Sequence, residues 1–72
     1  MAGSFQDDYP NITHWVKKHG WIEIGQNDYV KSFVRALDEG GMVWEGKTNY
    51  RTLEEAFQAL DTGLAEWLGH NR

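Results

Sequence analysis

The sequence predicts an α+β fold in which a helix, a three-stranded antiparallel β-meander and a C-terminal amphipathic helix follow one another. A segment with helical spacing ends at Gly20, segments rich in β-forming residues follow it, and a long amphipathic stretch begins after Thr52. A chain of 72 residues is long enough for one hydrophobic core but too short for two. We therefore expect a single domain over residues 9–70, preceded by a flexible tail over residues 1–8.

The first helix is expected between Pro10 and His19, and the first strand directly after it. The apolar residues of this segment recur at helical intervals: Ile12, Trp15 and Val16. Proline is tolerated in a first helical turn, and Gly20 is expected to end the helix. Residues 21–25 are rich in β-formers and precede a turn-prone stretch, so they predict a strand.

Residues 29–38 are compatible with two structures. As a helix they would have Asp28 as N-cap and an apolar face. As a strand they would form a hairpin with residues 41–46 through a turn at Glu39 and Gly40. The hairpin would place Leu37 opposite Met42, Ala36 opposite Val43, and Arg35 opposite Trp44. Because about three strands are needed for a stable sheet, the strand is favoured and the helix is the alternative.

The last helix is expected to begin with a capping box, in which Thr52 and Glu55 satisfy each other's backbone amides. One stripe of the helix is apolar: Leu53, Ala56, Phe57, Leu60, Leu64, Trp67 and Leu68. Gly69 is expected to close the helix. Gly63 lies within the stripe, where it predicts a close approach to the sheet.

Charge and composition exclude several classes of function. Seven Lys and Arg against eleven Asp and Glu give a net charge of −4, which disfavours binding to a phosphate backbone. No apolar run approaches the roughly 20 residues of a membrane span, so no membrane partner is expected. The absence of cysteine excludes disulfides and thiolate metal sites, and we expect a cytoplasmic protein.

No grouping of residues predicts catalysis, a cofactor or a metal site. The glycines form neither a dinucleotide-binding pattern nor a phosphate loop, and the serines lack the setting of a nucleophile. His14 and His19 are five residues apart, which on a continuous helix separates them by about 140°. We therefore expect the chain not to be an enzyme.

The four tryptophans are the feature that invites a functional explanation. Trp15 and Trp67 lie on apolar helix stripes and are expected in the core. Trp, Tyr and Arg dominate the energetics of protein interfaces. The expected partner-binding residues lie on and around the sheet: Trp21, Tyr29, Val34, Arg35, Val43 and Trp44. The alternative is that the first helix covers this face. The prediction is thus a small interaction or regulatory module that binds another protein, or a second copy of itself, through sheet aromatics or a strand edge.

A second hypothesis is nucleic-acid recognition by aromatic stacking. It would require a local basic patch despite the net charge, from Lys17, Lys18, Lys31, Arg35, Lys47 and Arg51. The predicted order of elements is that of double-stranded-RNA-binding domains, which use a lysine cluster at the start of their second helix. This chain has Thr52, Glu54 and Glu55 there, so nucleic acid is the less favoured partner.

Three stretches in the second half of the chain form a recognisable pattern: residues 41–46, the stretch from Tyr50 to Ala56 with its T-x-E-E-A pattern, and the final Trp67 and Leu68. Through these stretches the second half of the chain resembles HicB-like antitoxin domains. It implies a three-stranded sheet with a packed helix that binds a partner protein. The sequence as a whole is also similar to small uncharacterised bacterial proteins, cyanobacterial ones among them.

Overall fold

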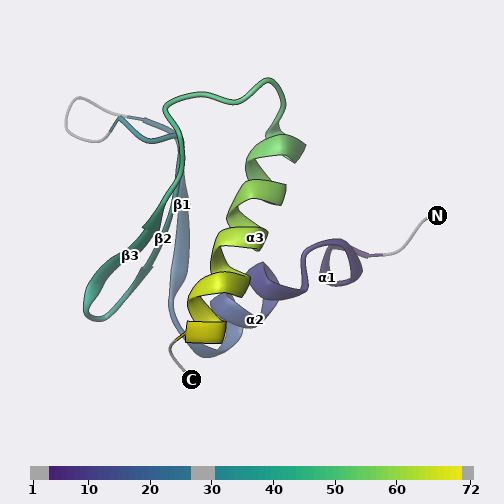
Figure 1. Ribbon diagram of the computed structural model, residues 1–72, viewed down its shortest axis with the longest axis vertical. Helices are drawn as coiled ribbons and strands as arrows, with labels where there is room; N and C mark the ends of the chain where they lie inside the picture. Colours follow the sequence, from purple (N-terminus) through teal and green to yellow (C-terminus); the bar gives the residue numbers. More distant parts are fainter. Residues whose placement is uncertain (1–3, 27–30, 71–72) are drawn as a thin grey trace.

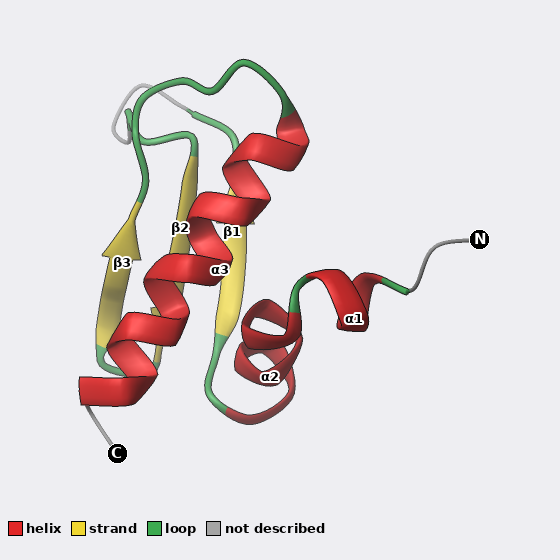
Figure 2. Cartoon of the chain, turned by 45° about the vertical axis from the view of Figure 1, so that its right-hand side comes forward, coloured by secondary structure: helices red, strands yellow, loops and turns green. Residues whose placement is uncertain are grey.

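The computed structural model describes residues 4–26 and 31–70, and within them the predicted order of elements is confirmed. Two helices, α1 (Phe5–Asp8) and α2 (Pro10–Lys18), precede the strands β1 (Trp21–Ile24), β2 (Val34–Asp38) and β3 (Gly41–Glu45). The chain then ends in the long helix α3 (Leu53–His70). Figure 1 shows α2 and α3 on the same side of the sheet, and Figure 2 shows α3 running across its face.

The three strands form one antiparallel sheet in the order β1-β2-β3. Residues 34–38 are therefore strand, and the helix that was the alternative for this segment does not form. The predicted pairing of Leu37 with Met42 is confirmed, but the next pair is Ala36 with Trp44, and Arg35 lies opposite Glu45. The predicted pairings of Ala36 with Val43 and of Arg35 with Trp44 are wrong, because a bulge at Val43 adds one residue to β3.

The core lies between the sheet and the two helices. Its fully buried side chains come from every layer, and the largest are Trp15, Val34, Leu60 and Leu64. Trp67 meets Trp15 edge to face, with ring centroids 5.2 Å apart. The indole N–H of Trp15 donates to the carbonyl oxygens of Leu37, at 3.1 Å, and of Trp21, at 3.3 Å. Trp15 and Trp67 thus pack in the core as predicted, and Trp15 ties α2 to two strands.

The side chain of Asp61 in α3 caps the beginning of α2. Its carboxylate accepts hydrogen bonds from the backbone amides of Asn11 and Ile12, at 2.9 and 3.0 Å, and from the side-chain amide of Asn11, at 3.0 Å. These amides belong to the first helical turn, where backbone donors lack partners within the helix and a negative charge is favourable. The two helices are therefore joined by a polar contact as well as by apolar packing.

Residues 4–8, for which the sequence predicts a flexible tail, form the short helix α1. Ser4 and Asp7 cap it reciprocally, each side chain accepting from the other's backbone amide. The ring of Phe5 lies 4.9 Å from that of Tyr9 and 5.8 Å from that of Phe57. Burial raises the pKa of the Tyr9 phenol above its ordinary value, and neighbouring carboxylates add to this. The aromatic contacts hold α1 against α3.

The capping box of α3 forms only in part. The hydroxyl of Thr52 accepts from the amide of Glu55 at 3.0 Å, as predicted. The carboxylate of Glu55 accepts from the amide of Arg51, at 3.2 Å, rather than from that of Thr52. At the other end the helix continues through Gly69 to His70, so the predicted end at Gly69 is wrong by one residue.

Candidate functional site

The sequence-predicted partner residues lie in three different environments. Val34 is fully buried, so its expected place in an exposed group is wrong. Val43 and Trp44 are partly buried and pack against the core on the helix side of the sheet. Trp21 is 45% exposed and alternates with the inward-facing Ile22, which places its side chain on the face away from the helices. Tyr29, the sixth predicted residue, lies outside the described residues.

Arg35 is held within the domain instead of projecting toward a partner. It is 5% exposed, and its guanidinium donates to the carbonyl oxygens of Ser32, at 2.8 Å, and Gly25, at 2.9 Å. A third bond, at 3.3 Å, reaches the carboxylate of Glu23 on the neighbouring strand. These bonds fix the two ends of the connection between β1 and β2, so Arg35 has a structural role there.

The bulge at Val43 decides where Trp44 lies. It gives β3 two consecutive residues, Val43 and Trp44, that both pack toward the core, and it places Trp44 on the face opposite to Arg35. The Arg35 side chain therefore does not lie beside the Trp44 indole, where the predicted pairing would have placed it. The indole instead covers Gly63 of α3, where an added Cβ would lie 2.7 Å from Trp44 Cδ1. The close approach predicted at Gly63 is confirmed, and the group that approaches is the Trp44 ring.

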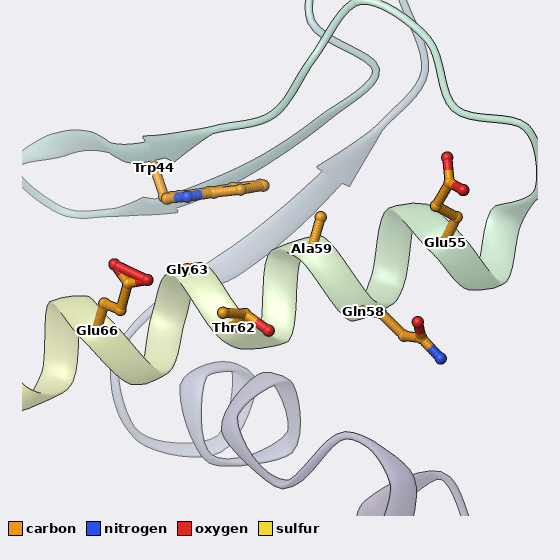
Figure 3. A pocket seen from close by; sticks show the side chains of 7 residues that line it. All are labelled: Trp44, Glu55, Gln58, Ala59, Thr62, Gly63 and Glu66. Atoms are coloured by element: carbon orange, nitrogen blue, oxygen red, sulfur yellow. The ribbon is translucent and has the colours of Figure 1, made fainter.

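A groove of about 530 Å³ lies between α3 and this tryptophan. Residues from three turns of α3 line it together with Trp44: Glu55, Gln58, Ala59, Thr62, Gly63 and Glu66. Figure 3 shows the indole over the helix between Ala59 and Glu66, with the carboxylates of Glu55 and Glu66 on either side of it along the helix. In the same view Gln58 and Thr62 point away from β3. We call this feature the Trp44 groove.

The charge of the Trp44 groove defines the ligands that it suits. Its two ionisable side chains, Glu55 and Glu66, are both acidic, and its aromatic wall is an indole, the ring that attracts cations most strongly. Glu66 is exposed, whereas Glu55 is partly buried and already accepts one backbone hydrogen bond. Glu55 and Glu66 are eleven residues apart on α3, so a single arginine or lysine side chain that lies along the indole could donate to one of them, and the groove is suited to a cation.

The basic residues that would form a nucleic-acid patch lie at two ends of the sheet. Lys17 and Lys18 belong to the last turn of α2, which leads into β1, whereas Lys47 follows β3. Because β1 and β3 are both antiparallel to β2, the start of β1 and the end of β3 lie at opposite ends of the sheet. Arg35 is buried. The structure therefore does not gather the six basic residues into one patch.

The second surface of interest is the sheet face away from the helices, which no helix of the described chain covers (Figure 1). Trp21 and Met42, which are 45% and 49% exposed, lie on this face at opposite edges of the sheet. Leu37 of β2 pairs with both of them and lies between them. The Glu23–Arg35 ion pair lies beside these residues on the same face, and the indole N–H of Trp21 donates to Glu23 at 3.2 Å. The alternative that the N-terminal helix covers this face is wrong, because α2 packs beside α3.

Comparison with protein-family models, with curated proteins and with solved structures finds no match for this chain. Within the part of the chain that the structure describes, no helix is both long enough and apolar enough to cross a membrane. No group of three or more His, Cys, Asp or Glu side chains among these residues could hold a metal ion. The groove and the open sheet face are therefore the features on which a function can be argued.

The signals for the groove are only partly visible in the sequence. Gly63 within an apolar stripe indicates that a neighbour approaches closely, but not which neighbour. Glu55 and Glu66 belong to the polar side of α3 in a helical projection, and only the bulge brings Trp44 between them.

Proposed function

We propose that this protein is a small, non-enzymatic, cytoplasmic interaction module that binds a basic segment of a partner protein in the Trp44 groove. The observation that carries the proposal is the partly buried Trp44 indole between two carboxylates, those of Glu55 and Glu66. The net charge of −4 favours encounter with a basic partner. The resemblance of the second half of the chain to HicB-like antitoxin domains also points to a protein partner, and a regulatory role follows from it as part of the proposal.

The energetic contributions of the groove are modest and of different kinds. A cation over an exposed indole is worth about 0.5–1 kcal/mol, and more where the pair loses water. An exposed ion pair with Glu66 adds about 0.2–1 kcal/mol. Such a site selects a cationic side chain, while the remaining affinity comes from the segment on either side of it.

The test is a binding titration with a labelled arginine-rich peptide and, for comparison, an acidic peptide of equal length. We expect the basic peptide to bind and the acidic peptide not to bind. Glu66→Gln removes one charge from the groove and should weaken binding by up to about fivefold, as expected for the loss of about 0.2–1 kcal/mol.

Glu45→Gln is the matched control, because it removes the same charge from β3. Glu45 is exposed and lies opposite Arg35, on the face away from Trp44. Equal weakening by the two substitutions would mean that only net charge attracts the peptide, and the groove would lose its role. Absence of any binding by the basic peptide would contradict the proposal as a whole.

A further inference from the structure

Two histidines that the sequence separates are brought together at the end of α2. The helix ends at Lys18, and His19 is the C-cap residue, with backbone angles (φ −120°, ψ −48°) outside the helical range. The helix thus ends between the two histidines, and the angular separation expected for a continuous helix does not apply to them. Their Nε2 atoms lie 3.3 Å apart, and their ring centroids 5.0 Å apart.

This separation matches that of two imidazole ligands on one metal ion. Zinc binds histidine nitrogen at about 2.0–2.1 Å in tetrahedral geometry, which places two ligand nitrogens about 3.3–3.4 Å apart. Both rings are exposed, so an ion can reach the pair from solvent. Binding requires each ring to carry its hydrogen on Nδ1, which leaves both Nε2 lone pairs for the metal.

The surrounding structure fixes one of the rings. His19 stacks on Trp15 with ring centroids 5.0 Å apart and planes inclined by 14°. Trp15 is fully buried, and its indole N–H is held by two backbone carbonyl oxygens. The backbone amide of His19 donates to the carbonyl oxygen of Trp15, at 2.8 Å. His14 lies one turn into α2, whose first turn Asp61 anchors. A preformed pair loses less conformational entropy on binding an ion than two free side chains do.

We infer that His14 and His19 form a two-histidine site for a divalent transition-metal ion of the zinc, nickel and copper group. Imidazole nitrogen suits these ions, whereas magnesium and calcium prefer oxygen ligands. Two protein ligands leave the other coordination positions to water or to donors from a bound molecule. The inference is independent of the Trp44 groove. The groove lies between α3 and β3, whereas the two histidines belong to α2 and its C-cap.

The experiment is a titration of the protein with Zn²⁺ at about pH 8, where free imidazole is neutral. Imidazole resonances in NMR spectra identify the ligands directly in the wild-type chain. We expect the signals of His14 and His19 to shift together and to saturate at one ion per chain. Mg²⁺ at the same concentration should leave them unchanged.

Variants give the second measurement. Removing a residue that only hydrogen-bonds to a metal ligand costs about 10–100-fold in metal affinity. Because His14→Ala removes a ligand itself, it should weaken Zn²⁺ binding by at least about tenfold. His14 is exposed and lies outside the core cluster, so this variant should fold, as circular dichroism can verify. Lys18→Ala, one turn further along α2, should retain the wild-type affinity. Unchanged His14 and His19 signals at saturating Zn²⁺, or unchanged affinity in His14→Ala, would overturn the inference.

Discussion

Replacing Gly63 with alanine tests whether the indole of Trp44 is in contact with the backbone of α3. The Cβ of the new residue would overlap the Trp44 ring, at 2.7 Å from Cδ1 and 2.5 Å from Cε2. Carbon atoms cannot approach this closely, so either the indole or the helix must move. Gly69→Ala is the matched control, because Gly69 also belongs to α3 and a Cβ there meets no atom within 4 Å.

Two opposing effects determine the size of the change. Alanine is a better helix former than glycine by about 1 kcal/mol in a helix interior, which stabilises both variants, though less so near the helix end at Gly69. Overpacking a well-packed contact costs about 1–3 kcal/mol, and only Gly63→Ala incurs this cost. We therefore expect the free energy of unfolding of Gly63→Ala to be lower than that of Gly69→Ala, by between a few tenths of a kcal/mol and about 3 kcal/mol.

Thermal unfolding followed by circular dichroism measures this difference without relying on tryptophan fluorescence. For a domain of this size, each kcal/mol corresponds to about 4–8 °C in Tm. Repeating Gly63→Ala in a Trp44→Ala background removes the overlap, so the substitution should then become neutral or stabilising. If Gly63→Ala is as stable as Gly69→Ala, or if its effect is the same without Trp44, the described contact between β3 and α3 is refuted.

Four further substitutions test other contacts by chemical unfolding. Arg35→Met should destabilise the domain by about 2–4 kcal/mol, because it leaves buried carbonyl oxygens without a donor; a loss below 0.5 kcal/mol would contradict the network. Asp61→Ala removes the cap of α2 and should cost about 1–2 kcal/mol, whereas no loss would show that water replaces the carboxylate. Trp15→Ala should cost about 3–5 kcal/mol and Trp21→Ala less than about 1 kcal/mol; equal costs would contradict their different burial.

The elements of the fold could be predicted because each carries a local signal. The apolar spacing of Ile12 and Trp15, the β-forming stretches and the Thr52 cap each depend on neighbouring residues alone, and the structure contains all of them. The hairpin turn also follows from local sequence, and with it the pairing of Leu37 with Met42.

The parts that could not be predicted depend on contacts between distant residues. The bulge at Val43 carries no local signature, yet it moves Trp44 out of register with Arg35 and into contact with Gly63. The helical turn at residues 5–8 has a weak signal, the spacing of Ser4 and Asp7, but it is held in place by the packing of Phe5 on Phe57. Asp61 lies on the polar side of α3 in the sequence pattern, and its role as the cap of α2 follows only from the packing of α2 beside α3.

The measurement that tests the central claim most directly is an NMR titration of the ¹⁵N-labelled protein with a short arginine-containing peptide. Because the Trp44 groove is proposed to take the basic side chain, the indole N–H signal of Trp44 and the amide signals of Gly63 and Glu66 should shift progressively and saturate. The indole N–H signal of Trp21, on the opposite face of the sheet, should stay unchanged. Shifts confined to Trp21 and the open sheet face, or no shift at any peptide concentration, would contradict the account.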